Sequence, residues 1–295
     1  MNIVKFIRRK RITIGDVGIA LYLLACCAIV IIPMIHIIAI SFSDATRIVP
    51  GLTIIPEKFS MMSYEKTFGS TQMWTGLKNS VIIVCIMVPV SVMFNAMCAF
   101  ATSKEGLPGS KFLRLFFVIL MYFGAGMIPS FLTMNAYGLV GTFFIYFAGW
   151  TSPYWMILTR NYMAGIAASL EEAALLDGAN YWTYFLRICI PVSLPILATF
   201  TLFSFVGTWN GYTSTLIYNL TKPENYTLQY VLYLSLVQVN QELGQEALSV
   251  LDFSEANSTT MRCALTVVTL VPVTIVYPFL QKYIISGITL GAVKE

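Results

Sequence analysis

The chain has 295 residues, of which 57% are hydrophobic and 11% are charged, with 18 Lys and Arg against 14 Asp and Glu and a mean hydropathy of +0.75. Soluble domains carry roughly 25% charged residues, so this composition excludes a soluble enzyme and predicts an all-α polytopic membrane protein. One histidine and six cysteines without a CxxC pair leave no basis for a His-rich metal site or a Ser-His-Asp triad. The sequence contains no Gly-Lys dipeptide, which excludes a Walker A loop, so any ATP that drives this protein must be bound by another chain.

Six segments reach the length of about 20 apolar residues that a helical membrane crossing requires. A basic N-terminal segment, residues 1–17, precedes the first of them and places the N-terminus in the cytoplasm. Six crossings then return residues 288–295 to the cytoplasm, so both termini are expected on that side of the plasma membrane. The predicted crossings are residues 18–42, 77–102, 112–135, 138–163, 192–217 and 262–285.

Two long segments between crossings are expected on the outer side. Residues 43–76 contain an amphipathic stretch from Phe59 to Phe68, which predicts a short helix at the membrane interface. Residues 218–261 are net negative and form either a solvated cover or a docking surface for an extracellular partner. Residues 77–287 form the functional module, to which the first crossing is an added anchor. The acidic residues of the second outer loop are Glu224, Glu242, Glu246, Asp252 and Glu255.

The loop between the fourth and fifth crossings, residues 166–191, contains the most informative pattern. Ser169 stands three residues before Glu172, which is the spacing of a capping box, and the Ala- and Leu-rich residues around them favour helix. Gly178 then permits a left-handed turn. We therefore predict a short helix, a glycine turn and a second helix over Tyr181–Arg187, ahead of the fifth crossing.

This loop resembles the EAA motif of permease subunits of binding-protein-dependent ABC importers. The flanking sequence EEAALLDGANYW resembles the carbohydrate-importing branch, which includes the maltose permease subunits. Residues 124–129, 209–210 and 277–283 look like the LplC/YtcP type, whose members are permeases for oligosaccharides or complex glycans. The family pattern E-A-A-x3-G-x9-I-x-L-P is matched, with isoleucine in place of the leucine, by Glu172, Ala173, Ala174, Gly178, Ile188, Ile190 and Pro191.

The resemblance implies a type I ABC importer transmembrane fold over residues 77–287, with a cytoplasmic coupling helix that docks on an ATPase. It also implies the partners: a second homologous permease subunit, two copies of a cytoplasmic ABC ATPase that bind ATP and Mg²⁺, and an extracellular solute-binding protein. No cofactor and no nucleic acid are expected on this chain. The structural alternative is a helix that only braces two crossings. The expected ATPase-coupling residues are Glu171, Glu172, Ala173, Ala174, Asp177 and Gly178.

A polar stripe along the fifth crossing is the candidate substrate path. Its members recur at helical spacing, and aromatic faces together with amides suit the C–H surfaces and hydroxyls of a sugar. The same segment contains Gly207-x3-Gly211, a small-residue pattern that mediates helix packing, so packing and sugar contact both remain open. The candidate path residues are Ser204, Thr208, Trp209, Asn210, Tyr212 and Thr215.

Two other functional classes are alternatives to a permease. An ion-coupled secondary transporter would need titratable groups within the membrane, whereas crossings two to six contain no Asp or Glu. A membrane glycosyltransferase would need paired carboxylates near one membrane face, whereas the outer acids are scattered through one loop. We therefore predict a transport subunit, not an enzyme, that moves an oligosaccharide or complex glycan by alternating access. Asn95, within the second crossing, is expected to form an interhelical hydrogen bond.

Overall fold

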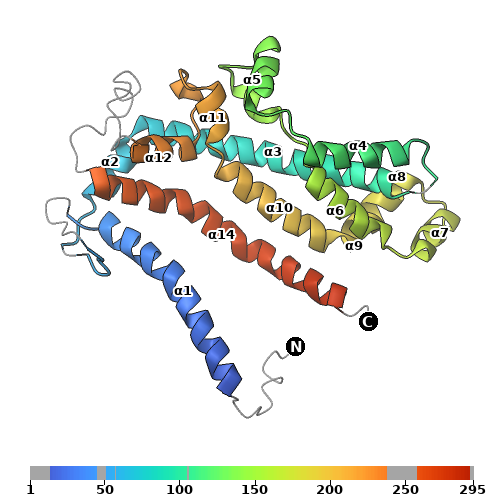
Figure 1. Cartoon of the computed structure of the whole chain (residues 1–295), viewed down its shortest axis with the longest axis horizontal. Helices are drawn as coiled ribbons and strands as arrows, with labels where there is room; N and C mark the ends of the chain where they lie inside the picture. Colours follow the sequence, from blue (N-terminus) through green and yellow to red (C-terminus); the bar gives the residue numbers. More distant parts are fainter. Residues whose placement is uncertain (1–13, 45–50, 57, 105, 238–257, 293–295) are drawn as a thin grey trace. The chain divides into compact units, whose positions relative to one another are not determined.

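The regular structure is helical throughout the residues that the computed structural model describes, which are 14–44, 51–56, 58–104, 106–237 and 258–292 (Figure 1). One isolated β-bridge, between Ser43 and Phe59, is the exception within those ranges. Elements η3 and η5 are 3₁₀-helices, and η4 is a π-helical turn. In chain order the elements are α1 Ile14–Ser41, α2 Met62–Gly69, α3 Thr71–Ser103, α4 Ser110–Tyr122, α5 Met127–Ala136, η3 Phe143–Phe147, α6 Pro153–Ala164, α7 Ala168–Leu176, α8 Tyr181–Tyr184, η4 Phe185–Cys189, α9 Ile190–Val192, α10 Leu194–Trp209, α11 Thr213–Tyr218, η5 Pro223–Asn225, α12 Leu228–Val237 and α14 Ser258–Ala292.

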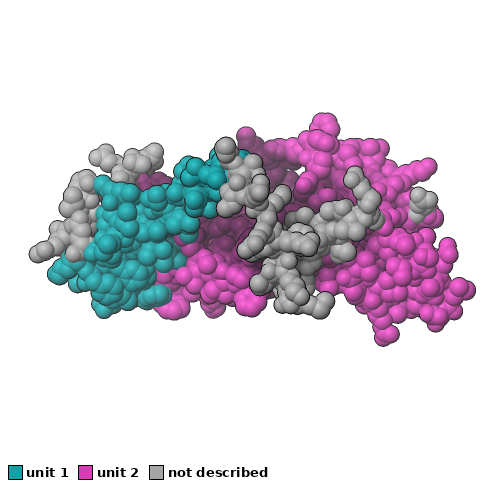
Figure 2. All heavy atoms as spheres, turned by 90° about the horizontal axis from the view of Figure 1, so that it is seen from below, with its two compact units in different colours: residues 1–69, 253–267 teal, residues 70–252, 268–295 magenta. Residues whose placement is uncertain are grey.

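The chain divides into two units, coloured separately in Figure 2. The first unit comprises residues 1–69 and 253–267, and the second comprises residues 70–252 and 268–295. The second unit contains both candidate functional segments of the sequence.

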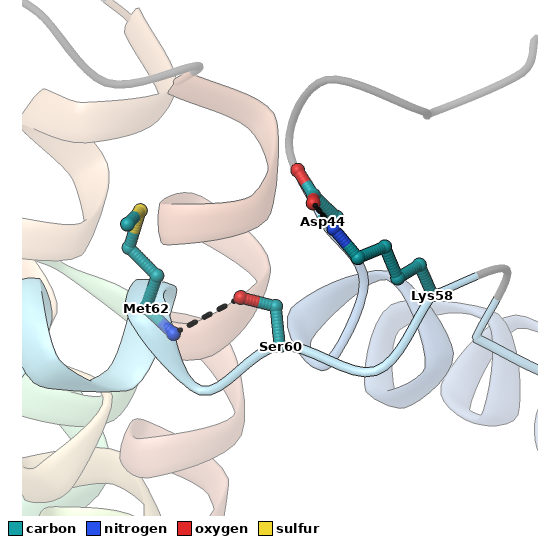
Figure 3. A network of polar contacts seen from close by, with 4 residues as sticks. All are labelled: Asp44, Lys58, Ser60 and Met62. Carbon is teal, nitrogen blue, oxygen red and sulfur yellow. Dashed lines mark hydrogen bonds and ion pairs between the residues drawn. The ribbon is translucent and has the colours of Figure 1, made fainter.

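In the first unit, residues 58–60 lie beside the end of α1 and lead into α2 (Figure 3). This segment is held by the backbone amide of Ser60, which donates to the carbonyl of Phe42 at 2.8 Å. Lys58 Nζ lies 2.9 Å from Asp44 Oδ2, an exposed pair of the kind that contributes little stability. Ser60 Oγ accepts from the amide of Met62 at 3.3 Å, where α2 begins. The helix predicted over residues 59–68 is therefore confirmed, with its first residue at Met62.

Helix α3 is the central element of the second unit. Its 33 residues span about 50 Å at 1.5 Å per residue, and Ser70 caps its N-terminus by accepting from the amide of Met73. Pro89 lies near its middle. In Figure 1, α12 lies beside its N-terminal part, and α6 and α10 pack against it further along. One buried cluster surrounds the C-terminal part of α3 and comprises Ala96, Ala99, Phe117, Met156, Met163, Ala174, Tyr184, Phe185, Cys189 and Leu197.

Helix α12 packs so closely on α3 that a glycine is required between them. A Cβ atom at Gly76 would lie 3.1 Å from the backbone N and Cα of Leu228 and 3.2 Å from Val231 Cγ2. Leu228, Tyr230 and Val231 are fully buried. The predicted outer loop, residues 218–261, thus contains a short helix whose buried side chains pack against α3, and its location outside the membrane stays a prediction.

The third predicted crossing, residues 112–135, is not one continuous helix. Helix α4 ends at Tyr122, and α5 begins at Met127 at an angle of 115° to it. Gly126 adopts a left-handed φ of 81°, which a helix cannot accommodate and which glycine adopts without steric cost. The segment is apolar, as predicted, but its apolar composition does not indicate the break between the two helices.

The fourth predicted crossing, residues 138–163, is not one continuous helix. Gly138 and Gly141 adopt positive φ angles of 68° and 78°, and η3 follows as a short 3₁₀ segment. The regular helix α6 begins at Pro153, which occupies the first helical turn, where the missing amide has no cost. Pro153 interrupts this apolar segment, as its sequence predicts, and the two glycines add a further non-helical stretch before η3.

Among the residues that the structure describes, three helices are long and apolar enough to cross a membrane alone: Gly15–Ser41, Thr71–Ser103 and Thr259–Phe279. The total reaches five if each bent pair, α4 with α5 and Tyr181–Val192 with α10, counts as one crossing. Helix α6 has 12 residues and is too short by itself. Six crossings thus remain a prediction.

Asn95 of α3 supplies hydrogen bonds to the non-helical backbone that precedes α6. Its Nδ2 donates to the carbonyl of Trp150 at 3.1 Å, and its Oδ1 accepts from the amide of Ser152 at 3.1 Å. Asn95 is fully buried. Asn95 therefore bonds to another segment of the chain, as predicted, but the partner is the irregular backbone that leads into α6 and not a helix.

We expect Asn95→Leu to destabilise the full chain by about 1–3 kcal/mol, because it removes the two hydrogen bonds that the buried Asn95 side chain makes with the backbone of Trp150 and Ser152. The measurement is thermal unfolding of the purified chain in mild detergent, with Asn135→Leu as the control. Asn135 is an exposed residue of α5, so its substitution is expected to leave the unfolding midpoint unchanged. Equal midpoints for the two variants would contradict the role assigned to Asn95.

Candidate functional site

Helix α7 and the turn after it form the segment that carries the EAA pattern. The helix ends in a Schellman motif, in which the amide of Ala179 donates to the carbonyl of Ala174 at 2.9 Å and the amide of Gly178 donates to that of Leu175 at 3.0 Å. Gly178 has a φ of 81°, so the predicted glycine turn is confirmed. The chain then reverses into α8.

The predicted capping box is wrong. Helix α7 begins at Ala168, with Ala167 at the N-cap position and no side-chain cap. Ser169 and Glu172 therefore both lie inside the helix. The extended backbone of Ala167, with φ −57° and ψ 129°, already turns the chain into the helix two residues earlier than expected.

The two sides of α7 differ in exposure. Ala174 is the buried residue of this helix and belongs to the cluster around α3, while Glu171, three residues before it, is half-buried. Glu172, Ala173 and Leu176 are exposed and share the other face, since Leu176 lies four residues after Glu172 and three after Ala173. The side chain of Leu176 is 88% exposed. Asp177 and Gly178 at the end of the helix are also exposed.

The helix after the glycine turn is longer than predicted. Asn180 caps it, with Oδ1 accepting from the amide of Thr183 at 2.8 Å, and it runs through α8 and η4 into α9 as far as Val192. The π-helical turn η4 buries Phe185 and Cys189 in the cluster around α3. A π-turn inserts one extra residue per turn and is common at functional sites.

Lys104, which is not among the predicted coupling residues, contacts this segment. It is the first residue after α3, and its Nζ donates to Glu171 Oε2 in the first turn of α7. The ammonium group also lies 5.0 Å from the ring centroid of Phe100 and 4.7 Å from that of Tyr184. A lysine directly after an apolar crossing is typical of the membrane interface. No local pattern in the sequence indicates that Lys104 pairs with Glu171.

A cavity of about 750 Å³ opens beside this ion pair. Lys104, Arg160, Glu171 and Tyr184 are among its lining residues. Arg160 is anchored by Nη1, which donates to Asn161 Oδ1 at 3.0 Å. Within the described residues, no group of three or more His, Cys, Asp or Glu side chains is placed to hold a metal ion.

The fifth predicted crossing contains a helix break that interrupts the polar stripe. Helix α10 ends at Trp209, and α11 begins only at Thr213. A Cβ atom at Gly211 would lie 3.2 Å from the carbonyl oxygen of Thr208, so a glycine is needed where the chain departs from the helix. The prediction of one helical stripe from Ser204 to Thr215 is therefore wrong beyond Trp209.

The six candidate path residues occupy different environments. Trp209 is buried, and its Nε1 donates to the carbonyl of Thr269 at 3.0 Å. The buried Thr215 Oγ1 lies 2.8 Å from the Tyr146 hydroxyl. Tyr212 stacks on Tyr233, with ring centroids 4.7 Å apart. Ser204 and Thr208 are half-buried one helical turn apart, Tyr212 is half-buried as well, and Asn210 is exposed at the break.

The beginning of the predicted acidic outer loop is bound tightly to the N-terminal part of α3. Asn79 Nδ2 donates to the carbonyls of Glu224 and Tyr226, at 2.8 and 2.9 Å, and Ser80 Oγ accepts from the amide of Leu228 at 2.9 Å. The Tyr226 hydroxyl donates to the carbonyl of Leu220 at 2.6 Å. Burial raises the pKa of Tyr226, and the carboxylate of Glu224 acts in the same direction, so the hydroxyl keeps its proton. The remaining acids, Glu242, Glu246, Asp252 and Glu255, lie outside the described residues.

Comparison with known sequences identifies a family over most of the chain. Residues 73–290 match the model of the family described as "Binding-protein-dependent transport system inner membrane component". The chain is 32% identical over 275 residues to the polygalacturonan/rhamnogalacturonan transport system permease protein YtcP of Bacillus subtilis (strain 168), covering 92% of this chain and 96% of that protein. It is 29% identical over 291 residues to protein LplC of the same organism, covering 95% and 94%.

Solved structures agree with this match. A bacterial ABC transporter described as involved in the import of the acidic polysaccharide alginate contains a chain with a TM-score of 0.82 and 31% identity, over 93% of this chain and 98% of that one. A second alginate transporter structure, in complex with a pentasaccharide-bound periplasmic protein, has a TM-score of 0.56 and 15% identity over 90% and 93%, and it shows similarity of fold alone.

The sequence prediction of an ABC importer permease is thus confirmed. The chain belongs to the family of binding-protein-dependent transport system inner membrane components, and it is a multi-pass inner-membrane permease subunit of an ABC importer.

Proposed function

We propose that the chain is one of two non-identical permease subunits in an ATP-driven importer of an oligosaccharide or complex glycan, working by alternating access in a prokaryotic plasma membrane. The carbohydrate named for YtcP and the polysaccharide named for the alginate transporter support this substrate class. The observation that carries the coupling role is the outward face of α7, where Glu172, Ala173 and Leu176 are exposed on a helix that a Schellman motif ends.

The proposed topology has six crossings and cytoplasmic termini. In it, α4 with α5 forms one bent crossing, and residues 138–163 cross with α6 as their regular part. The 12 residues of α6 reach about 18 Å, so the irregular backbone before them must complete the crossing. Such backbone is tolerated at membrane depth only where protein or a water-filled cavity surrounds it, and Asn95 provides protein contacts there.

Helix α7 is proposed to dock on the ATPase subunit, which binds the ATP and Mg²⁺. An 88% exposed leucine beside a small alanine is an apolar surface that a partner protein would cover. Glu172 adds an exposed carboxylate next to them for a charge-assisted hydrogen bond. Two ATPase copies are expected, one for each permease subunit.

The substrate path is proposed to follow the members of the predicted set that are not buried: Ser204, Thr208, Asn210 and Tyr212. Trp209 and Thr215 instead support the path from within the protein, since both use their polar atoms on buried partners. The exposed amide of Asn210 at the helix break offers a donor and an acceptor for sugar hydroxyls.

We expect Asn210→Ala to lower uptake at limiting sugar about tenfold, because one lost hydrogen bond to substrate is worth about 1 kcal/mol or more. The measurement is uptake of labelled sugar against concentration, with unfolding midpoints measured alongside. Trp209→Phe, which removes only an internal donor, is expected to lower the unfolding midpoint and to leave the KM for sugar unchanged. A raised KM in Trp209→Phe with normal kinetics in Asn210→Ala would reverse the two assignments.

The proposed function is tested by purifying the tagged full chain from its native membrane in mild detergent and identifying what accompanies it. We expect a second permease and an ATPase, and we expect the reconstituted complex to hydrolyse ATP faster when a glycan-loaded binding protein is added. A chain that purifies as a homodimer without an ATPase, and that accumulates substrate in response to an ion gradient, would refute the proposal and support the secondary transporter.

A further inference from the structure

The C-terminal end of α3 is joined to α7 by an ion pair between residues 67 positions apart in the sequence. The Lys104 and Glu171 side chains are each 24% exposed. An ion pair that is largely removed from solvent is less screened than a surface pair, and its loss is felt more strongly. The pair is therefore more than a surface contact.

The position of the ammonium group is set by two aromatic rings as well as by the carboxylate. Phe100 lies one turn before Lys104 in α3, and Tyr184 comes from α8; their ring centroids are 6.1 Å apart. The ammonium lies 5.0 and 4.7 Å from the two rings, which is within the range of cation–π attraction. Tyr184 is 2% exposed and belongs to the cluster around α3. A buried and rigid surface therefore holds the lysine in place.

Helix α7 has few other attachments. Its nine residues are too short to be stable as an isolated helix, and Ala174 is its buried residue. Ala174 and Glu171 are three residues apart and so lie on the same face. Ala174 and the pair with Lys104 therefore both fix this face of α7 to the cluster around α3, in addition to the turn that leads into α8.

Resting on the proposed function, we propose that Lys104 is a positioning residue for ATP coupling. The Lys104–Glu171 pair fixes α7 to the end of α3, so that a displacement of α7 on the ATPase moves α3 with it. The two adjacent acids have separate roles: Glu171 faces inward and holds the helix, and Glu172 faces outward and contacts the ATPase.

Charge reversal on both sides of the pair tests this role in the reconstituted complex. We expect Lys104→Glu and Glu171→Lys each to reduce the sugar moved per ATP hydrolysed about tenfold, the low end for loss of a charge-assisted hydrogen bond, while the ATPase still co-purifies and retains basal hydrolysis. The double reversal is expected to return to within about threefold of the unmodified chain, since only the cation–π attraction is then missing. A merely structural role would not predict this rescue.

Lys111→Glu is the matched control, because Lys111 is an exposed lysine of α4 and its reversal changes the net charge equally. Its coupling ratio is expected to be unchanged. If Lys104→Glu also left the coupling ratio unchanged while Glu171→Lys abolished transport, Glu171 would act on the ATPase directly and the proposal would be overturned. A double reversal as impaired as either single variant would overturn it as well.

A second measurement uses the full chain without any partner. A carbodiimide joins a carboxylate to an amine with no spacer, and the adjoining cavity of about 750 Å³ admits the reagent. We expect mass spectrometry to find a peptide cross-linked between Lys104 and Glu171, and its absence from the folded chain would refute the pair. A cross-linked chain that never associates with an ATPase would refute the proposed function, whereas a coupled complex indifferent to Lys104→Glu would refute only the role of the pair.

Discussion

Glu172→Lys is expected to reduce ATP-driven sugar uptake about 100-fold or more. The substitution removes a charge-assisted hydrogen bond worth about 1.5–3 kcal/mol and places a like charge against the basic group that the ATPase would supply. Because Glu172 is exposed on α7, the chain itself should fold and insert as before. Uptake by the reconstituted complex, and ATP hydrolysis stimulated by the loaded binding protein, are measured together and should fall together.

The matched control for this prediction is Glu65→Lys, in the first turn of α2. Glu65 is also an exposed glutamate in a short helix, and its reversal changes the net charge by the same amount. Uptake by this variant should remain within about twofold of normal, since exposed substitutions typically change the free energy by less than about 0.5 kcal/mol. Normal uptake by Glu172→Lys would remove the outward face of α7 from the coupling mechanism and leave the bracing helix as the better explanation.

Gly76→Val is expected to destabilise the chain by about 1–3 kcal/mol or more, which is the usual cost of overpacking a filled site. A Cβ atom there would lie 3.1 Å from the backbone of Leu228, so the backbone of α12 would have to shift, and rotation of a side chain would not relieve the contact. The larger valine side chain also presses on the backbone that donates the hydrogen bond from the amide of Leu228 to Ser80. Thermal unfolding of the purified full chain measures the effect.

Gly207→Ala distinguishes this collision from a general effect of replacing a helical glycine. Both glycines lie inside helices, but nothing lies within 4 Å of a Cβ atom at Gly207. Alanine is favoured over glycine in a helix by about 1 kcal/mol, so Gly207→Ala should raise the unfolding midpoint slightly, whereas Gly76→Ala should lower it. A higher midpoint in Gly76→Ala would show that α12 does not pack on α3 at this distance.

The parts of the fold that were predictable from the sequence depend on local rules. The glycine turn after α7 follows from the left-handed conformation of Gly178, and the helix before it follows from Ala and Leu propensity. The length and composition of α3 identified a membrane crossing directly. Such features involve residues that are close together in the chain, so one sequence is sufficient to reveal them.

The parts that were missed depend on distant residues or on single glycines within apolar runs. Average hydropathy does not detect the helix breaks at Gly126 and Gly211, because the residues on both sides of each break are apolar. The pairing of Lys104 with Glu171 joins two positions with no pattern in common. Helix α12 lies within a stretch predicted as an outer loop, and only the fold shows that half of its ten residues are buried.

The proline in the middle of α3 has a mechanical consequence. Pro89 has no amide to donate to the carbonyl of Cys85, so one backbone hydrogen bond is missing near the midpoint of a helix about 50 Å long. Bending stiffness is therefore lowest at mid-length, while each half stays rigid. The half that carries Asn79 and the half that ends at Lys104 can tilt about this point as two stiff arms, without unwinding either one.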